Sequence, residues 1–115
     1  MSVDLFVHFK TSVEFPKLFA ALKEKYPFLE FKTVSHQCFD IEFAGLNKCG
    51  VDHNPTEQYL CISSNTNFWD YVEFSALIIA EALDIAEIDD PQDGKPILIS
   101  KQRILELEKI VQQSL

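Results

Sequence analysis

Residues 67–86 read NFWDYVEFSALIIAEALDIA, and this stretch decides the fold. Wound as a helix, it is apolar on most sides, which is typical of a buried helix. Asn67 is a good N-cap residue, and Asp70 and Glu73 complement the positive end of the helix dipole. The sequence therefore predicts a central helix over residues 68–86, packed on a sheet.

The segments before this helix carry the alternation that is typical of strands. It predicts strands over residues 3–9, 28–34, 37–44 and 58–64. The clearest is the third, where Phe39 and Ile41 alternate with Asp40 and Glu42, so that one face is buried and the other is wet. The polar stretch Leu46–Glu57 is expected to be a loop.

Two amphipathic helices and two short connections complete the pattern. The first helix has one apolar stripe that Pro27 ends. This stripe consists of Phe15, Leu18, Phe19, Leu22 and Tyr26. After the central helix, residues 89–94 are expected to form a turn or loop and residues 97–99 a short strand. Ser100 is expected to cap the last helix, which buries Ile104, Leu107 and Val111. Four charged residues of this helix are expected to be solvated: Lys101, Arg103, Glu106 and Lys109.

The predicted fold is α+β, in the order β-α-β-β-β-α-(β)-α, with a mostly antiparallel sheet packed by helices. The 115 residues, 47% of them hydrophobic, suit a single globular domain over residues 1–115. The start of the chain lacks a secretory signal, and no apolar run approaches the roughly 20 residues of a membrane span. We expect a cytoplasmic protein.

Charge restricts the partners. The chain has 18 acidic and 10 basic residues, which gives a net charge of −8. Nucleic acids and anionic membranes require clustered Lys and Arg, so neither is an expected partner. From Asp70 to Asp93 there are eight acids and no base, while the remaining ten acids balance the ten bases. A basic protein partner suits this distribution.

The second half of the base-free stretch is the candidate partner-binding site. It comprises Asp84, Glu87, Asp89, Asp90 and Asp93. The sequence places these acids at the end of the central helix and in the turn that follows. A helix C-terminus disfavours acids because its dipole is negative there. One interpretation is a solvated face, and the other is a surface for a basic partner that relieves the repulsion.

The cysteines offer a second hypothesis. Cys38, Cys49, His53 and Cys61 supply thiol and imidazole groups of the kind that bind zinc or form a nucleophilic pair. There is no Cys-x-x-Cys pair, and the negative net field raises thiol pKa values. The pattern therefore favours reduced thiols with no metal, cofactor or catalytic residue, and the zinc or enzyme alternative stays open.

The chain resembles the small acidic immunity proteins of bacterial toxin systems of the contact-dependent growth inhibition type. Three features carry the resemblance: the helix start Asn67–Asp70, the helix body Ile79–Leu83, and the Asp89–Asp90 turn with Gly94 behind it. It implies a bacterial cytoplasmic protein that neutralises a cognate toxin by binding it, often a basic nuclease. A homo-oligomeric subunit, with Trp69 or Phe6 at the contact, is a further alternative, and the oligomeric state stays open.

Overall fold

The computed structural model describes residues 3–10, 13–43, 48–64, 69–84, 87–90 and 94–113. In these residues the chain forms seven strands and three helices. In chain order they are β1 (Val3–His8), α1 (Phe15–Lys25), β2 (Glu30–Ser35), β3 (Cys38–Glu42), β4 (Lys48–Asn54), β5 (Tyr59–Ser64), α2 (Trp69–Ala82), β6 (Glu87–Asp90), β7 (Lys95–Leu98) and α3 (Lys101–Gln113).

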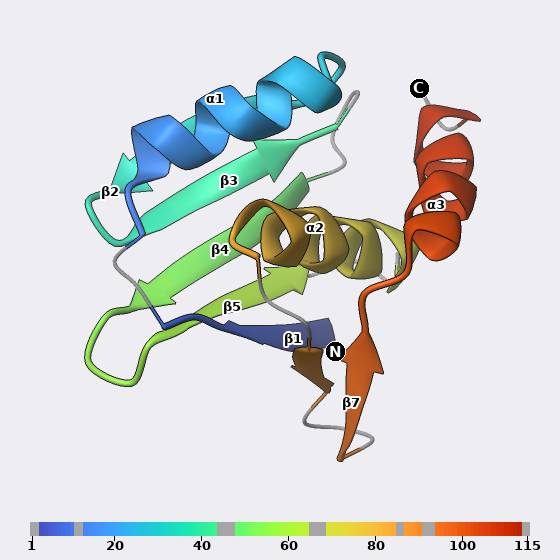
Figure 1. Cartoon of the computed structure of the whole chain (residues 1–115). Helices are drawn as coiled ribbons and strands as arrows, with labels where there is room; N and C mark the ends of the chain where they lie inside the picture. Colours follow the sequence, from blue (N-terminus) through green and yellow to red (C-terminus); the bar gives the residue numbers. More distant parts are fainter. Residues whose placement is uncertain are drawn as a thin grey trace.

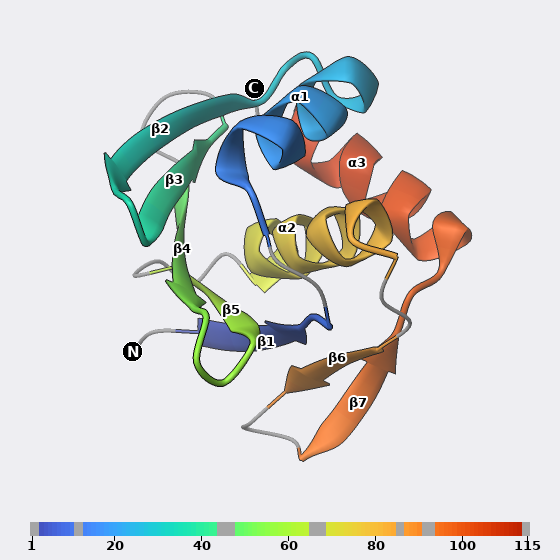
Figure 2. The same ribbon diagram turned by 60° about the vertical axis from the view of Figure 1, so that its left-hand side comes forward.

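The strands form one sheet in the order β2-β3-β4-β5-β1-β6-β7. Every pairing in it is antiparallel, and β1 lies between β5 and β6. The sheet is strongly curved, and the three helices lie on its concave side (Figures 1 and 2). The predicted fold class, an α+β domain with a mostly antiparallel sheet packed by helices, is confirmed.

Helix α2 is the centre of the packing, as its composition predicts. All ten residues from Tyr71 to Ala80 are buried, and the helix contacts α1, α3 and four strands. It ends at Ala82, earlier than predicted, because Asp84 has a left-handed backbone with φ 58°. Residues 85 and 86 and the predicted cap Asn67 lie outside the described residues.

Two strands lie where the sequence predicted loops. The predicted loop over residues 46–57 contains β4, whose Cys49 and Val51 are fully buried against the helices. The predicted turn at residues 89–94 overlaps β6, in which Ile88 is fully buried opposite Val7 of β1. Both strands read as polar because only alternate residues face the core.

The two flanking helices bury the residues that their periodicity predicts. Helix α1 buries Phe15, Leu18 and Leu22, and α3 buries Ile104, Leu107 and Val111. The Ser100 hydroxyl oxygen accepts the Arg103 backbone N–H at 3.3 Å, so the predicted cap is confirmed. No helix of the described ranges is long and apolar enough to cross a membrane.

Candidate functional site

The predicted partner-binding acids do not form a helix end with a turn. Asp84 is exposed in the turn after α2, whereas Glu87, Asp89 and Asp90 belong to strand β6. Asp93 lies outside the described residues. We expected these acids at the end of the central helix and in the turn that follows, but alternation along β6 places Asp89 and Asp90 on opposite faces of the sheet.

Asp89 belongs instead to the sheet face that is turned away from the helices, which we call the uncovered face. Residues paired across strands share a face. Asp89 pairs with Phe6, Phe6 with Cys61, Cys61 with Asp52, and Asp52 with Cys38, so one row crosses five strands. His8, two residues beyond Phe6 on β1, also reaches Asp89, and its Nε2 lies 2.6 Å from Asp89 Oδ2.

The uncovered face is predominantly acidic. Apart from Glu30, which pairs with Glu42 and binds Lys23 of α1 at 2.8 Å, the pairings place five carboxylates on it, namely those of Asp4, Asp40, Glu42, Asp52 and Asp89. They place two lysines there, Lys32 and Lys48, and Lys48 Nζ is already 3.7 Å from Asp40 Oδ2. Carboxylates therefore outnumber lysines on this face, and the acids come from β1, β3, β4 and β6.

A hollow of about 550 Å³ opens on this face over β1, β4 and β5. Its lining includes Phe6, Asp52, Asn54, Tyr59 and Cys61. The rings of Phe6 and Tyr59 are 5.2 Å apart between centroids and tilted by 58°, and Asn54 Nδ2 donates to Tyr59 Oη at 3.2 Å. The hollow therefore combines a carboxylate with a fixed aromatic pair.

The cysteine and histidine group does not converge. Cys49 and His53 point toward the helices, while Cys38 and Cys61 lie in the row across the uncovered face. His53 packs against the rings of Phe9 and Phe15 on the helix side. Among the described residues no three His, Cys, Asp or Glu side chains are grouped so as to hold a metal ion.

The thiols are also not activated. Burial raises the pKa of Cys49 to about 12 and that of Cys61 to about 11. Burial, with a hydrogen bond from the thiol to Asp52, raises the pKa of Cys38 to about 11. Burial lowers the pKa of His53. Thiols with such pKa values are protonated at neutral pH, so they are poor nucleophiles and poor metal ligands.

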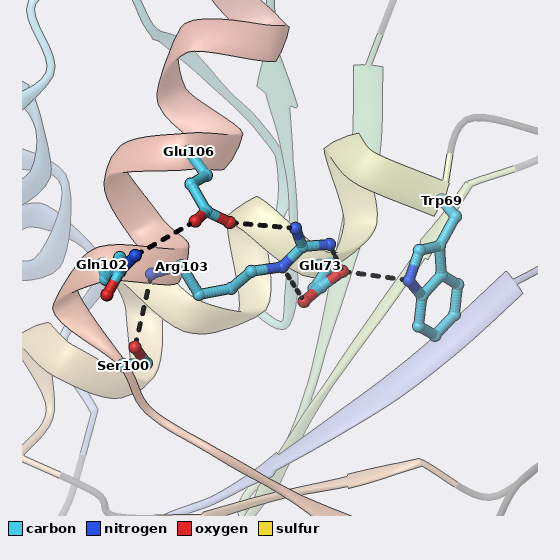
Figure 3. A network of polar contacts seen from close by, with 6 residues as sticks. All are labelled: Trp69, Glu73, Ser100, Gln102, Arg103 and Glu106. Atoms are coloured by element: carbon cyan, nitrogen blue, oxygen red, sulfur yellow. Dashed lines mark hydrogen bonds and ion pairs between the residues drawn. The ribbon is translucent and has the colours of Figure 1, made fainter.

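One polar cluster was not predicted from the sequence. Glu73 is buried in α2 at 8% exposure and accepts hydrogen bonds from Arg103 of α3 (Figure 3). Arg103 Nε lies 2.9 Å from Glu73 Oε2, and Arg103 Nη2 lies 2.8 Å from Oε1. The indole Nε1 of Trp69 donates to the same Oε1 at 3.0 Å. Arg103 was predicted to be solvated, but its side chain is only 39% exposed and its guanidinium binds Glu73, so it is solvated in part.

This cluster has a structural role, and it includes Trp69, which the sequence offered as a contact residue of a homo-oligomer. An acid inside an otherwise apolar helix requires a cation or hydrogen-bond donors, and that requirement was the available signal in the sequence. Trp69 uses its polar group inside the molecule, and Phe6 is half-buried beside Tyr59. The indole N–H of Trp69 is therefore used within the chain, whereas part of the Phe6 ring stays exposed.

Comparison with known proteins finds no matching protein family, no matching curated protein and no matching solved structure.

Proposed function

We propose that this chain is a non-catalytic binding protein that neutralises a basic protein partner. The resemblance to small acidic immunity proteins extends the proposal to a cognate bacterial toxin, such as a basic nuclease. The observation that carries the proposal is the uncovered face of the sheet. It presents five carboxylates beside two lysines, and one of those lysines is already engaged by Asp40.

Electrostatics gives this face a role in recognition. Opposite charges across an interface speed encounter and exclude wrong partners. The acids are spread over four strands of a rigid sheet, so their spacing is set by the fold and not by a mobile loop. This arrangement favours a folded basic surface as the partner.

The proposed location is the bacterial cytoplasm. Cys38, Cys49 and Cys61 are all free thiols. Thiols persist in reduced form in the cytosol, whereas secreted small domains commonly pair them. Reduced cysteines are therefore in keeping with a protein that intercepts a toxin inside the cell.

The test is identification of the partner followed by salt titration. The purified chain serves as bait in a lysate of its source cells, and the captured protein is then expressed alone and with this chain. We expect a basic protein that arrests growth when expressed alone and is harmless in the pair. Its affinity, measured by calorimetry, should fall as salt rises because screening weakens exposed charge pairs.

Charge-reversal variants locate the interface. The pair Asp4→Lys and Asp89→Lys should weaken binding of the captured partner. The matched pair Glu24→Lys and Glu108→Lys alters helices on the other side of the sheet and should leave binding unchanged. If both double variants lose the same affinity, only net charge matters. If neither variant loses affinity, the uncovered face is not part of the interface.

A further inference from the structure

The hollow on the uncovered face has the chemistry of a site for one cationic side chain. It lies at the middle of the row that joins β3, β4, β5, β1 and β6. Its volume, about 550 Å³, falls within the range of about 300–1,000 Å³ that is typical of ligand sites. It is open to solvent on one side, so a side chain that projects from another protein can enter it.

Asp52 is the charged group of this hollow. The other titratable side chains in the lining are Tyr59, Cys61 and His53, and burial lowers the pKa of His53, which disfavours its charged form. Asp52 is exposed and supplies the carboxylate of this hollow. No ion pair of the described residues engages Asp52. The thiol of Cys38 donates a hydrogen bond to the Asp52 carboxylate.

The aromatic pair favours a planar cation, such as a guanidinium group, over a compact ammonium group. Phe6 and Tyr59 are half-buried, and the hydrogen bond from Asn54 holds the Tyr59 hydroxyl in place. A guanidinium group stacks on aromatic rings and binds a carboxylate through two parallel hydrogen bonds, whereas an ammonium group does neither as well. The amide of Gln37 and the hydroxyl of Thr56 in the lining offer further polar contacts.

We propose that this hollow binds an arginine side chain that the basic partner presents, with its guanidinium paired to the Asp52 carboxylate and resting against Tyr59 and Phe6. This inference rests on the proposed function, because it assumes a basic partner. It adds a specific recognition point to a face that otherwise acts through its net charge.

The test uses a peptide in place of the unidentified partner. The ¹⁵N-labelled full chain is titrated with the blocked tripeptide acetyl-Gly-Arg-Gly-amide and followed by amide chemical shifts. We expect saturable shifts that cluster at Phe6, Asp52, Asn54, Tyr59 and Cys61. The matched citrulline peptide keeps the shape but has no charge, and it should produce no saturable shift. The lysine peptide should bind more weakly than the arginine peptide.

Two variants complete the test. Asp52→Asn removes the charge with little change in shape and should weaken arginine-peptide binding about tenfold, the expected effect of losing one charged hydrogen-bonded contact. Glu24→Gln removes a charge from α1, on the other side of the sheet from the hollow, and should leave binding unchanged. Shifts scattered over all acidic surfaces, equal binding of the citrulline peptide, or an unaltered Asp52→Asn variant would each overturn the inference.

The outcome separates this inference from the proposed function. A chain that neutralises a basic partner but shows no arginine-peptide binding at the hollow loses only the arginine site. A chain that binds the arginine peptide at the hollow but captures no basic partner retains the site and loses the proposed function.

Discussion

The ion pair between Glu73 and Arg103 gives the sharpest prediction about stability. The change is Arg103→Met, which keeps an unbranched side chain of similar length and removes the charge and all donors. Glu73 then keeps the hydrogen bond from the Trp69 indole and loses both guanidinium hydrogen bonds. A buried carboxylate that loses its cation bears an uncompensated desolvation cost.

The magnitude follows from burial. Breaking a well-buried ion pair by removing one partner costs about 3–5 kcal/mol, whereas exposed pairs contribute about 0–1 kcal/mol. The Glu73 side chain is 10% exposed and that of Arg103 is 39% exposed. Water thus reaches the guanidinium side of the pair, and we expect a loss of about 2–3 kcal/mol, between those two limits.

Urea unfolding measures this loss. Trp69 is the single tryptophan of the chain, but it belongs to the cluster, so far-UV circular dichroism should be recorded beside its fluorescence. With a slope of about 1–3 kcal/mol per molar urea, the midpoint should fall by roughly 0.7–3 M at unchanged slope.

The control is Glu106→Gln. Glu106 Oε2 lies 3.6 Å from Arg103 Nη1, and its side chain is 54% exposed, so this variant should stay within about 0.5 kcal/mol of the parent. The reasoning is refuted if Arg103→Met costs less than about 1 kcal/mol, because the buried pair would then contribute no more than a surface pair.

Two further predictions concern the last helix and the thiols. Ser100→Ala removes the acceptor for the Arg103 N–H and should cost about 1 kcal/mol in urea unfolding, while Ser100→Asp should retain most of the stability. Since the pKa of Cys61 is raised to about 11 and that of Cys49 to about 12, native thiols should resist iodoacetamide at pH 8. Cys61 should become reactive as pH rises toward 11, whereas fully buried Cys49 should be modified only in urea; mass spectrometry reads both. These thiols ionise more readily once unfolded, so stability should also fall as pH rises from about 9 toward 12. Rapid modification of Cys49 in the native chain at pH 8 would contradict its burial.

Local patterns predicted the helices because helix packing depends on a repeat within one segment. The stripe of α1 and the apolar body of α2 each bury the side that their sequence indicates. Strand β6 lacks such a signal, since it has four residues and its one apolar residue is Ile88. It is a strand because β1 and β7 pair with it on either side, and such pairing between distant segments leaves no periodic trace.

The candidate site was harder to predict than the fold, for a related reason. The face on which a strand residue lies depends on register, and a shift of one residue reverses it. Asp89 was predicted from its acidic neighbours, yet its position beside Phe6 follows from the pairing of β6 with β1. The hollow joins Phe6, Asp52 and Tyr59 from three strands, and no spacing in the sequence relates them.

The base-free stretch from Asp70 to Asp93 has a different meaning once its contacts are known. Because the stretch has no cation of its own, three of its acids pair with groups from elsewhere in the chain. Glu73 binds Arg103 of α3, Glu81 Oε1 lies 3.3 Å from Lys25 Nζ of α1, and Asp89 contacts His8 of β1.

Such contacts tie α2 and β6 to their neighbours, so three of the eight acids that mark this stretch in the sequence are used within the fold. The carboxylate best suited to recognition therefore lies outside the stretch, at Asp52. No described lysine or arginine forms an ion pair with Asp52, and the rings of Phe6 and Tyr59 lie in the same hollow. An acidic run in the sequence thus identifies acids that the fold has to neutralise, whereas a binding acid is one that the fold leaves available.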